Sequence, residues 1–340
     1  MKAFITAEFH PKGVELLEPF MEVHCEGWRS TGKIYFDGEE FAAKINEVAA
    51  DVLIVEADLV HEEVLSLCPL KIIGCCRGDP LNVLSDIATE KGIPVFYTPG
   101  RNADAVADLT LAFMLCLARN IVQISTLLKS GTVHFESEKD ILDVYNRYGG
   151  FELGGCTVGL LGLGAVGRKV AQRLKPFGPR VIVHDPYASR EVLEELQLEQ
   201  VSLERLVEDS DILSLHAALT DETHRIIGRS LIERMKPTSM LVNTARSFLV
   251  DEEALLEALR HRRIAGAALD VLDEEPVQED NPFLELDNVI VTPHIGGATR
   301  DVVRHQSEMI ASDIVRYLTG ERPEHIVNPE VLERRRGERQ

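Results

Sequence analysis

Residues 156–171 read CTVGLLGLGAVGRKVA, and this stretch decides the fold. It predicts a short buried strand, a glycine-rich turn with the pattern G-x-G-x-x-G, and the start of a helix. Gly162 permits the tight turn, Gly164 lets the backbone approach a pyrophosphate, and Gly167 lets the helix pack closely on the strand. The free N–H groups at the start of that helix then face the phosphate charge, so the stretch predicts a dinucleotide site.

An acidic residue completes the pattern. Asp185 follows a second apolar run, residues 180–184, and lies about 20 residues beyond the glycines. A carboxylate at this place hydrogen-bonds both hydroxyls of an adenine ribose and repels a 2′-phosphate, which predicts NAD rather than NADP. Glycines also mark ordinary turns, but strand, helix, second strand and acid together favour a ligand site over a purely structural βαβ unit.

Length and charge limit the other possibilities. A chain of 340 residues predicts two domains. Its net charge of −20, from 36 basic and 56 acidic residues, argues against a nucleic-acid partner, and the only dense basic run is the tail with Arg334, Arg335, Arg336 and Arg339. Because an acidic surface repels anions as a whole, any anion site must depend on local arginines and backbone amides.

Several other features favour a cytoplasmic protein without a metal. No run approaches the ~18 apolar residues of a membrane span, and the first eight residues predict a strand rather than a secretory signal. The six cysteines show no C-x-x-C and no metal-like spacing, as is typical of buried, reduced thiols. We therefore expect no membrane partner and no metal.

The first hundred residues alternate between strand and helix patterns. This alternation predicts one α/β unit, whose apolar runs are typical of buried parallel strands. The expected strands are residues 2–7, 51–56, 71–76 and 93–97, and the expected helices are residues 14–20, 39–50 and 61–67. One long helix is expected over residues 102–129, followed by a loop or arm over residues 130–155.

A second α/β series begins with the glycine motif. Strands are expected at residues 157–161, 180–184, 211–215, 239–243, 264–269 and 289–291, and a final helix at residues 300–318. The series predicts a doubly wound parallel sheet with ligands at the carboxyl ends of its strands.

Three polar residues follow three of the late strands. Arg246, Glu275 and His294 each come just after an apolar run. Hydride exchange between NADH and a 2-oxo acid requires a cation for the carboxylate, an acid for the emerging alkoxide, and a carboxylate that holds this acid. Arginine, histidine and glutamate supply these three groups.

The ordered motifs resemble those of the D-isomer-specific 2-hydroxyacid dehydrogenase family. The resemblance covers nearly the whole chain, through residues 71–78, 98–108, the glycine motif, 215–220 and the segments of the three polar residues. Two positions and one loop depart from the family pattern. Ala218 replaces a usual proline, Asp108 replaces a usual glutamate, and the loop of residues 77–83 has an unusual sequence, which leaves the substrate open.

The resemblance implies a fold and roles for individual residues. It implies two doubly wound Rossmann-like α/β domains with parallel sheets and an active site in the cleft between them. Residues 1–102 and 300–340 would form the substrate domain, and residues 103–299 the NAD-binding domain. His294 would be the acid/base, Glu275 its partner and Arg246 the carboxylate clamp. Besides the three glycines, the implied cofactor contacts are Ala165, Val166, Asp185, Thr244, Ala245, Asp270 and Gly296, and the implied substrate loop contains Arg77 and Gly78.

The predicted function is therefore that of an NAD-dependent oxidoreductase that interconverts a D-2-hydroxy acid and its 2-oxo acid. Glyoxylate, hydroxypyruvate, a phosphorylated three-carbon acid and a sugar acid all remain candidates for the small anionic substrate. An NADH-sensing, corepressor-like binding protein on the same fold is the alternative. Formate is disfavoured, because the formate enzymes carry glutamine where this chain has Glu275. The apolar helix over residues 102–129 and the arm to residue 155, together with the family's dimers, predict a homodimer in which this helix and arm are exchanged between subunits.

Overall fold

The computed structural model describes residues 1–337, with side chains as far as residue 333. The basic tail with Arg334, Arg335, Arg336 and Arg339 lies outside the residues whose side chains are described. The chain divides into two compact units: the first comprises Met1–Asn102 and Thr299–Gln340, and the second Ala103–Ala298. This division lies one residue before the expected one. Thr299 is the N-cap of the helix that follows, and its hydroxyl accepts the N–H of Val302.

The first unit contains a five-stranded parallel sheet in the order β2-β1-β3-β4-β5. In this order the chain adds strands first on one side of β1 and then on the other, as in a flavodoxin-like doubly wound sheet. Both faces are buried: Phe4 and Ile73 lie in one apolar cluster, and Ile5 and Ile72 in the other. The strands are β1 (Lys2–Ile5), β2 (Glu22–Cys25), β3 (Val52–Val55), β4 (Ile72–Cys75) and β5 (Val95–Tyr97).

The helices of the first unit come from both ends of the chain. The long α14 packs against α1, and a Cβ at Gly13 would lie only 2.8 Å from the Cβ of Ser307. The C-terminal segment therefore rejoins the N-terminal sheet. The helices are α1 (Pro11–Leu17), α2 (Trp28–Thr31), α3 (Gly38–Val48), α4 (Glu62–Leu67), α5 (Ser85–Glu90), α14 (Arg300–Thr319) and α15 (Glu330–Gly337).

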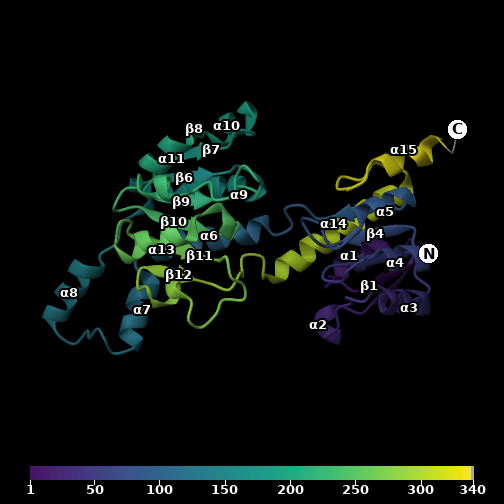
Figure 1. The fold of residues 1–340 in the computed structure, drawn as a ribbon, viewed down its shortest axis with the longest axis horizontal. Coiled ribbons are helices and arrows are strands. Elements are labelled where there is room, and N and C mark those ends of the chain that lie inside the picture. Colours follow the sequence, from purple (N-terminus) through teal and green to yellow (C-terminus); the bar gives the residue numbers. More distant parts are fainter. Residues whose placement is uncertain (338–340) are drawn as a thin grey trace. The chain divides into compact units, whose positions relative to one another are not determined.

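The second unit contains a seven-stranded parallel sheet in the order β12-β11-β10-β9-β6-β7-β8 (Figure 1). The strand order reverses between β6 and β9, which is where an open α/β sheet leaves a crevice for a ligand. The strands are β6 (Thr157–Leu161), β7 (Arg180–His184), β8 (Glu199–Gln200), β9 (Ile212–Leu215), β10 (Met240–Asn243), β11 (Gly266–Leu269) and β12 (Val289–Val291).

Helices cover both faces of this sheet, as the doubly wound pattern predicts. One apolar cluster contains residues of α6 and α9, and the other contains residues of α11 and α13. The helices are α6 (Ala103–Ala118), α7 (Ile121–Lys129), α8 (Glu138–Tyr148), α9 (Ala165–Leu174), α10 (Arg190–Leu196), α11 (Leu203–Asp209), α12 (Arg229–Ile232) and α13 (Glu252–Arg260). Short 3₁₀ turns lie at Leu153–Gly155, Lys175–Phe177, Ser247–Leu249 and Pro282–Glu285.

Two expectations about residues 102–155 were wrong. The single long helix is in fact two helices, α6 and α7, which meet at 65°, because Asn120 takes a left-handed conformation with φ of 51°. The arm is not merely a loop, because it contains α8. A capping box between Ser137 and Asp140 starts this helix. Figure 1 shows α8 set apart from the sheet of its unit.

Among the described residues, no single helix is both long and apolar enough to cross a membrane. The bent pair of α6 and α7 passes that test only when the two helices are taken together, and half of the residues of α6 are buried in the fold.

Candidate functional site

The glycine-rich turn has the geometry that a dinucleotide requires. Gly162 has a φ of 93°, and a Cβ there would lie 2.6 Å from the amide nitrogen of Ala217. A Cβ at Gly167 would collide with the carbonyl oxygen of Gly162. At Gly164, by contrast, a Cβ would meet nothing within 4 Å. Gly162 and Gly167 are therefore needed for the fold, whereas Gly164 borders open space that a pyrophosphate can occupy.

The start of α9 is free to bind an anion. Gly164 is its N-cap, and among the described residues no side chain caps this end of the helix. Arg168 points its Nε back to the carbonyl of Leu163, at 3.0 Å. The amide groups of Ala165 and Val166 therefore keep their donors available, and a helix N-terminus favours negative charge.

The expected ribose ligand, Asp185, follows β7 and is joined to the turn. Its Oδ2 accepts the N–H of Leu163 at 2.6 Å, and its Oδ1 accepts the N–H of Tyr187 at 2.8 Å. These bonds hold the carboxylate beside the glycine turn and leave lone pairs for further donors. The turn, the helix end and this acid fit the phosphates and ribose of a dinucleotide.

His216 lies in the floor of the same turn. Its Nε2 is 2.9 Å from the hydroxyl oxygen of Ser214, and its Cβ is 3.6 Å from where a Cβ of Gly167 would be. Burial lowers the pKa of His216 to about 3, so the ring is neutral at physiological pH. This histidine supports the turn and adds no positive charge to it.

His294 and Glu275 come together although 19 residues separate them. The Nδ1 of His294 lies 2.9 Å from Oε2 and 3.2 Å from Oε1 of Glu275. Both side chains are partly exposed, at 50% and 39%. The backbone of His294 is left-handed, with φ of 52°, and non-glycine residues adopt this conformation only where the surroundings hold them there.

Asp270 holds the segment that carries His294. Its backbone carbonyl accepts the N–H of His294 at 2.9 Å. Its buried carboxylate accepts the N–H groups of Ile295 and Gly296, both at 2.8 Å, and the hydroxyl of Thr292 at 2.5 Å. A Cβ at Gly296 would lie 2.9 Å from Oδ2, so only glycine allows this close approach. Asp270 thus keeps the left-handed His294 in place.

Arg246 follows β10 on a turn that Asn243 shapes. Asn243 Nδ2 donates to the carbonyl of Arg246 at 2.9 Å, and its Oδ1 accepts the N–H of Ala245 at 3.0 Å. The exposed guanidinium of Arg246 contacts its own chain, through the carbonyl of Ala245 at 2.7 Å. The neighbouring Thr244 is buried, with its hydroxyl 2.8 Å from that of Thr110. Sequence reasoning missed Asn243 and Thr292, and only their positions at strand ends could have indicated a role.

The sheet order places these segments in a row. His294, Glu275 and Arg246 follow β12, β11 and β10, which are adjacent and parallel. The glycine turn and Asp185 follow β6 and β7, on the other side of the reversal. The carboxyl ends of parallel strands share one edge of the sheet. Along this edge, the ribose and phosphate sites follow β7 and β6, and the three polar residues follow β10, β11 and β12. Of those three, His294 and Glu275 touch, and within the described residues no hydrogen bond joins Arg246 to either.

The expected substrate residues Arg77 and Gly78 belong to the first unit. Both are exposed and follow β4. The N–H of Arg77 donates to the carbonyl of Cys75 at 2.8 Å, and its carbonyl accepts the N–H of Thr98 at 2.9 Å. The backbone at Arg77 is therefore fixed, while its side chain is exposed.

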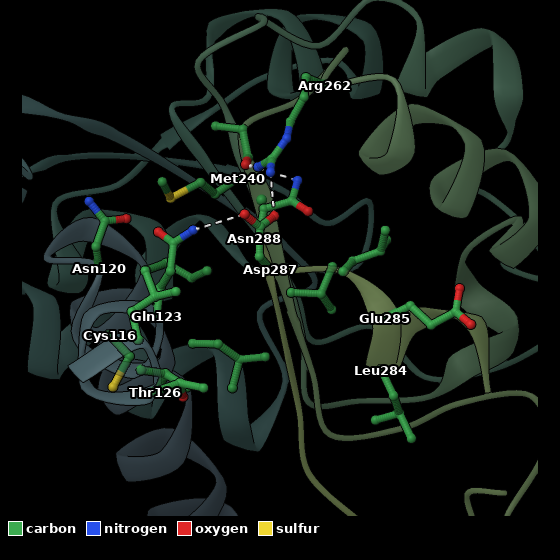
Figure 2. Close-up of a pocket in the computed structure, with 18 residues that line it drawn as sticks. Cys116, Asn120, Gln123, Thr126, Met240, Arg262, Leu284, Glu285, Asp287 and Asn288 are labelled. Carbon is green, nitrogen blue, oxygen red and sulfur yellow. Dashed lines mark hydrogen bonds and ion pairs between the residues drawn. The ribbon is translucent and has the colours of Figure 1, made fainter. Parts of the chain in front are cut away.

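A cavity of about 510 Å³ in the second unit lies elsewhere (Figure 2). Met240, Gly266 and Val289 line it, and these are the first residues of β10, β11 and β12. In Figure 2, Arg262 and Gln123 both point to the carboxylate of Asp287, which accepts a hydrogen bond from each. Since this cavity opens at the amino edge of the sheet, it is separate from the site described above.

Fold and site together define a dinucleotide-binding oxidoreductase with a histidine–carboxylate pair at the same sheet edge. The family model for the NAD binding domain of D-isomer specific 2-hydroxyacid dehydrogenases matches residues 111–296. The chain belongs to the D-isomer specific 2-hydroxyacid dehydrogenase family, and its cofactor is NAD.

Individual relatives agree with this. The chain is 38% identical to the glyoxylate reductase of Thermococcus litoralis, over 97% of this chain and 98% of that one. It is 39% identical to the D-3-phosphoglycerate dehydrogenase of Methanocaldococcus jannaschii, over 96% of this chain but only 59% of that relative. The crystal structure of the TT0316 protein from Thermus thermophilus superposes with a TM-score of 0.79 at 34% identity, over 96% of this chain and 100% of that one.

Proposed function

We propose that this protein interconverts a D-2-hydroxy acid and its 2-oxo acid, with NAD as the hydride carrier and His294 as the acid/base. The contact between His294 Nδ1 and Glu275 carries the proposal. Because Nδ1 is held by the carboxylate, the ring turns its other nitrogen, Nε2, away from Glu275. Among the described residues, nothing bonds to that nitrogen, so it is free to exchange a proton with substrate.

The roles of the side chains follow from charge. Bound NADH supplies the hydride for the carbonyl carbon. During reduction, protonated His294 donates its proton to the carbonyl oxygen, and during oxidation neutral His294 accepts the hydroxyl proton. The Glu275 carboxylate orients the ring and stabilises the imidazolium. Arg246 binds the substrate carboxylate as a cation, and a local cation is needed because the chain as a whole carries a net charge of −20.

We further propose which residues bind NAD and which bind the substrate. Ala165 and Val166 would bind the pyrophosphate, Asp185 the adenine ribose, and Thr244, Ala245, Asp270 and Gly296 the nicotinamide end of NAD. Arg77 and Gly78 would bind the substrate. Asp185 favours NAD over NADP, because its carboxylate repels a 2′-phosphate.

The test is consumption of NADH with a panel of 2-oxo acids. Glyoxylate comes first, because the relative matched over 98% of its length is a glyoxylate reductase. Hydroxypyruvate, a phosphorylated three-carbon acid and a sugar acid follow. His294→Ala should lower kcat by about 10²–10⁴-fold, the usual contribution of positioned proton transfer. His261→Ala, at an exposed histidine that ends α13, is the matched control.

The same panel separates the alternative function. Tight NADH binding without turnover of any acid would favour an NADH-sensing, corepressor-like protein instead. Full activity of His294→Ala would remove this histidine from the mechanism.

We also propose a homodimer in which α7 and α8 contact the second copy. No residue of either helix is buried in the single chain, although both helices carry large apolar side chains. In α8, Leu142 is 64% and Tyr145 is 74% exposed. Water-exposed apolar faces of this kind mark interaction sites.

All six cysteines are free thiols, which fits a reducing cytoplasm.

A further inference from the structure

Two carboxyl groups are neighbours, one on α13 and the other on the segment that carries Glu275. Glu252 lies in the first turn of α13, and Asp273 lies two residues before Glu275. Oε2 of Glu252 accepts the backbone N–H of Asp273 at 2.7 Å. A side chain of α13 therefore holds the backbone of the segment that presents the partner of His294.

The side chain of Asp273 indicates that the neighbouring carboxyl group of Glu252 carries a proton. Its Oδ1 is buried and has no hydrogen-bond partner among the described residues, whereas buried polar atoms are nearly always paired. An ionised Glu252 cannot supply a donor, but a protonated Glu252 can. One proton on Glu252 thus supplies the hydrogen-bond donor that Oδ1 of Asp273 lacks, and it also removes the repulsion between two neighbouring carboxylates.

The electrostatics agree with a proton held at this place. Burial is the main reason that the pKa of Glu252 rises to about 7, and the charge of Asp273 contributes to the rise. The hydrogen bond from the Asp273 N–H and the charge of Arg225 oppose it. On its own helix, Glu252 is flanked by the acidic Asp251 and Glu253.

Glu252 also adjoins the segment that carries Arg246. It lines a cavity of about 10 Å³ together with Asn243 and Ser247, the residues on either side of the Arg246 turn. Asn243 bonds directly to the backbone of Arg246. The Glu252 carboxyl group therefore lies next to two of the three segments that supply the polar residues of the site.

We propose that Glu252 is a positioning residue: through a proton shared with Asp273, it holds the Asp273–Glu275 segment so that Glu275 meets His294. Glu252 itself touches neither substrate nor cofactor. The proposal rests on the proposed roles of Glu275 and His294. When Glu252 ionises, it still accepts the N–H of Asp273 but can no longer donate to Oδ1, and the two carboxylates repel each other. This repulsion displaces the Asp273–Glu275 segment.

Substitutions separate the hydrogen bonds from the charge. Glu252→Gln keeps an acceptor for the Asp273 N–H, supplies an N–H donor for Oδ1 and cannot ionise. Glu252→Ala removes all of these interactions. We expect Glu252→Ala to lower kcat on the order of 10- to 100-fold, as misplaced catalytic groups do, with little change in NADH affinity, and Glu252→Gln to restore kcat at pH 7. Glu253→Gln, at the exposed neighbour, is the charge-matched control.

The pH profile of oxidation provides a readout that a merely structural role would not move. Oxidation needs neutral His294, so this step alone predicts a rate that rises with pH and then levels off. In the wild type and in Glu253→Gln, we expect kcat to decline above about pH 7 as Glu252 ionises, and in Glu252→Gln this decline should be absent. Identical alkaline limbs in wild type and Glu252→Gln would overturn the proposal, even if Glu252→Ala fails to fold.

A measurement without turnover distinguishes this proposal from the proposed function. NMR of ¹³C-labelled histidine rings, assigned with His294→Ala, reports the pH at which His294 titrates. In Glu252→Ala this midpoint should move to lower pH, because Glu275 no longer stabilises the imidazolium, whereas Glu253→Gln should leave it in place. An unmoved midpoint in folded Glu252→Ala contradicts the positioning role. A moved midpoint in a protein that turns over no 2-oxo acid supports the positioning role and contradicts only the proposed reaction.

Discussion

The imidazole Nδ1 of His294 lies 2.9 Å from the carboxylate Oε2 of Glu275, and the two residues follow adjacent parallel strands. Glu275→Gln keeps a hydrogen-bond acceptor at this distance but removes the charge that stabilises the imidazolium. Reduction requires the imidazolium, so we expect the pH profile of reduction to move to lower pH while NADH binding stays nearly unchanged. Initial rates between pH 5 and pH 9 check this, with Glu274→Gln as the control one residue away. A profile that stays in place would remove Glu275 from the mechanism.

The second prediction concerns the choice of dinucleotide. Replacing Asp185 by serine removes the charge beside the proposed 2′-position, while the hydroxyl can still accept the N–H of Leu163. The ratio of kcat/KM for NADH to that for NADPH should fall from well above one towards one. Glu195→Ser, at an exposed acid of α10, is the control for a general change in charge. Equal use of NADH and NADPH by the wild type would show that Asp185 has been assigned wrongly.

The third prediction is a pH dependence of stability that originates at Glu252. The pKa of this group rises from 4.5 to about 7 on folding, so between these values the folded state binds the proton more tightly than the unfolded state. Its contribution to the free energy of unfolding is therefore full below about pH 4.5 and is lost as pH rises through 7. Thermal unfolding of the wild type and Glu252→Gln at a series of pH values measures the difference. We expect wild-type Tm to fall relative to that of Glu252→Gln between pH 5 and pH 8, and parallel curves would contradict this.

The fourth prediction tests the homodimer. Leu142→Glu places a charge on the exposed apolar face of α8, where the dimer proposal puts the second copy. Sedimentation velocity at micromolar concentration should show a dimer for the wild type and a monomer for Leu142→Glu. Lys139→Glu, at an exposed polar position of the same helix, should leave the dimer intact. A monomeric wild type would end the proposal.

Much of the fold was predictable from the sequence, because its patterns are local. The strands β6, β7 and β12 have the predicted bounds. Strands buried on both faces appear as continuous apolar runs, and the glycine turn leaves its mark in three residues. The two-residue β8 and the exposed β2 were missed, because so few or such polar residues carry no apolar pattern. The break between α6 and α7 at Asn120 was missed, because a left-handed residue gives no signal within an otherwise helical sequence pattern.

By itself, the sequence determined the family, the dinucleotide turn and the identity of the polar residues that end three late strands. Only the tertiary structure decided which of these residues touch and what holds them in place. The contact of His294 with Glu275, the bond from Gly296 to Asp270 and the pairing of Glu252 with Asp273 join residues 19, 26 and 21 positions apart. Such contacts depend on the register of neighbouring strands and on burial, and neither is written in the local pattern of the chain.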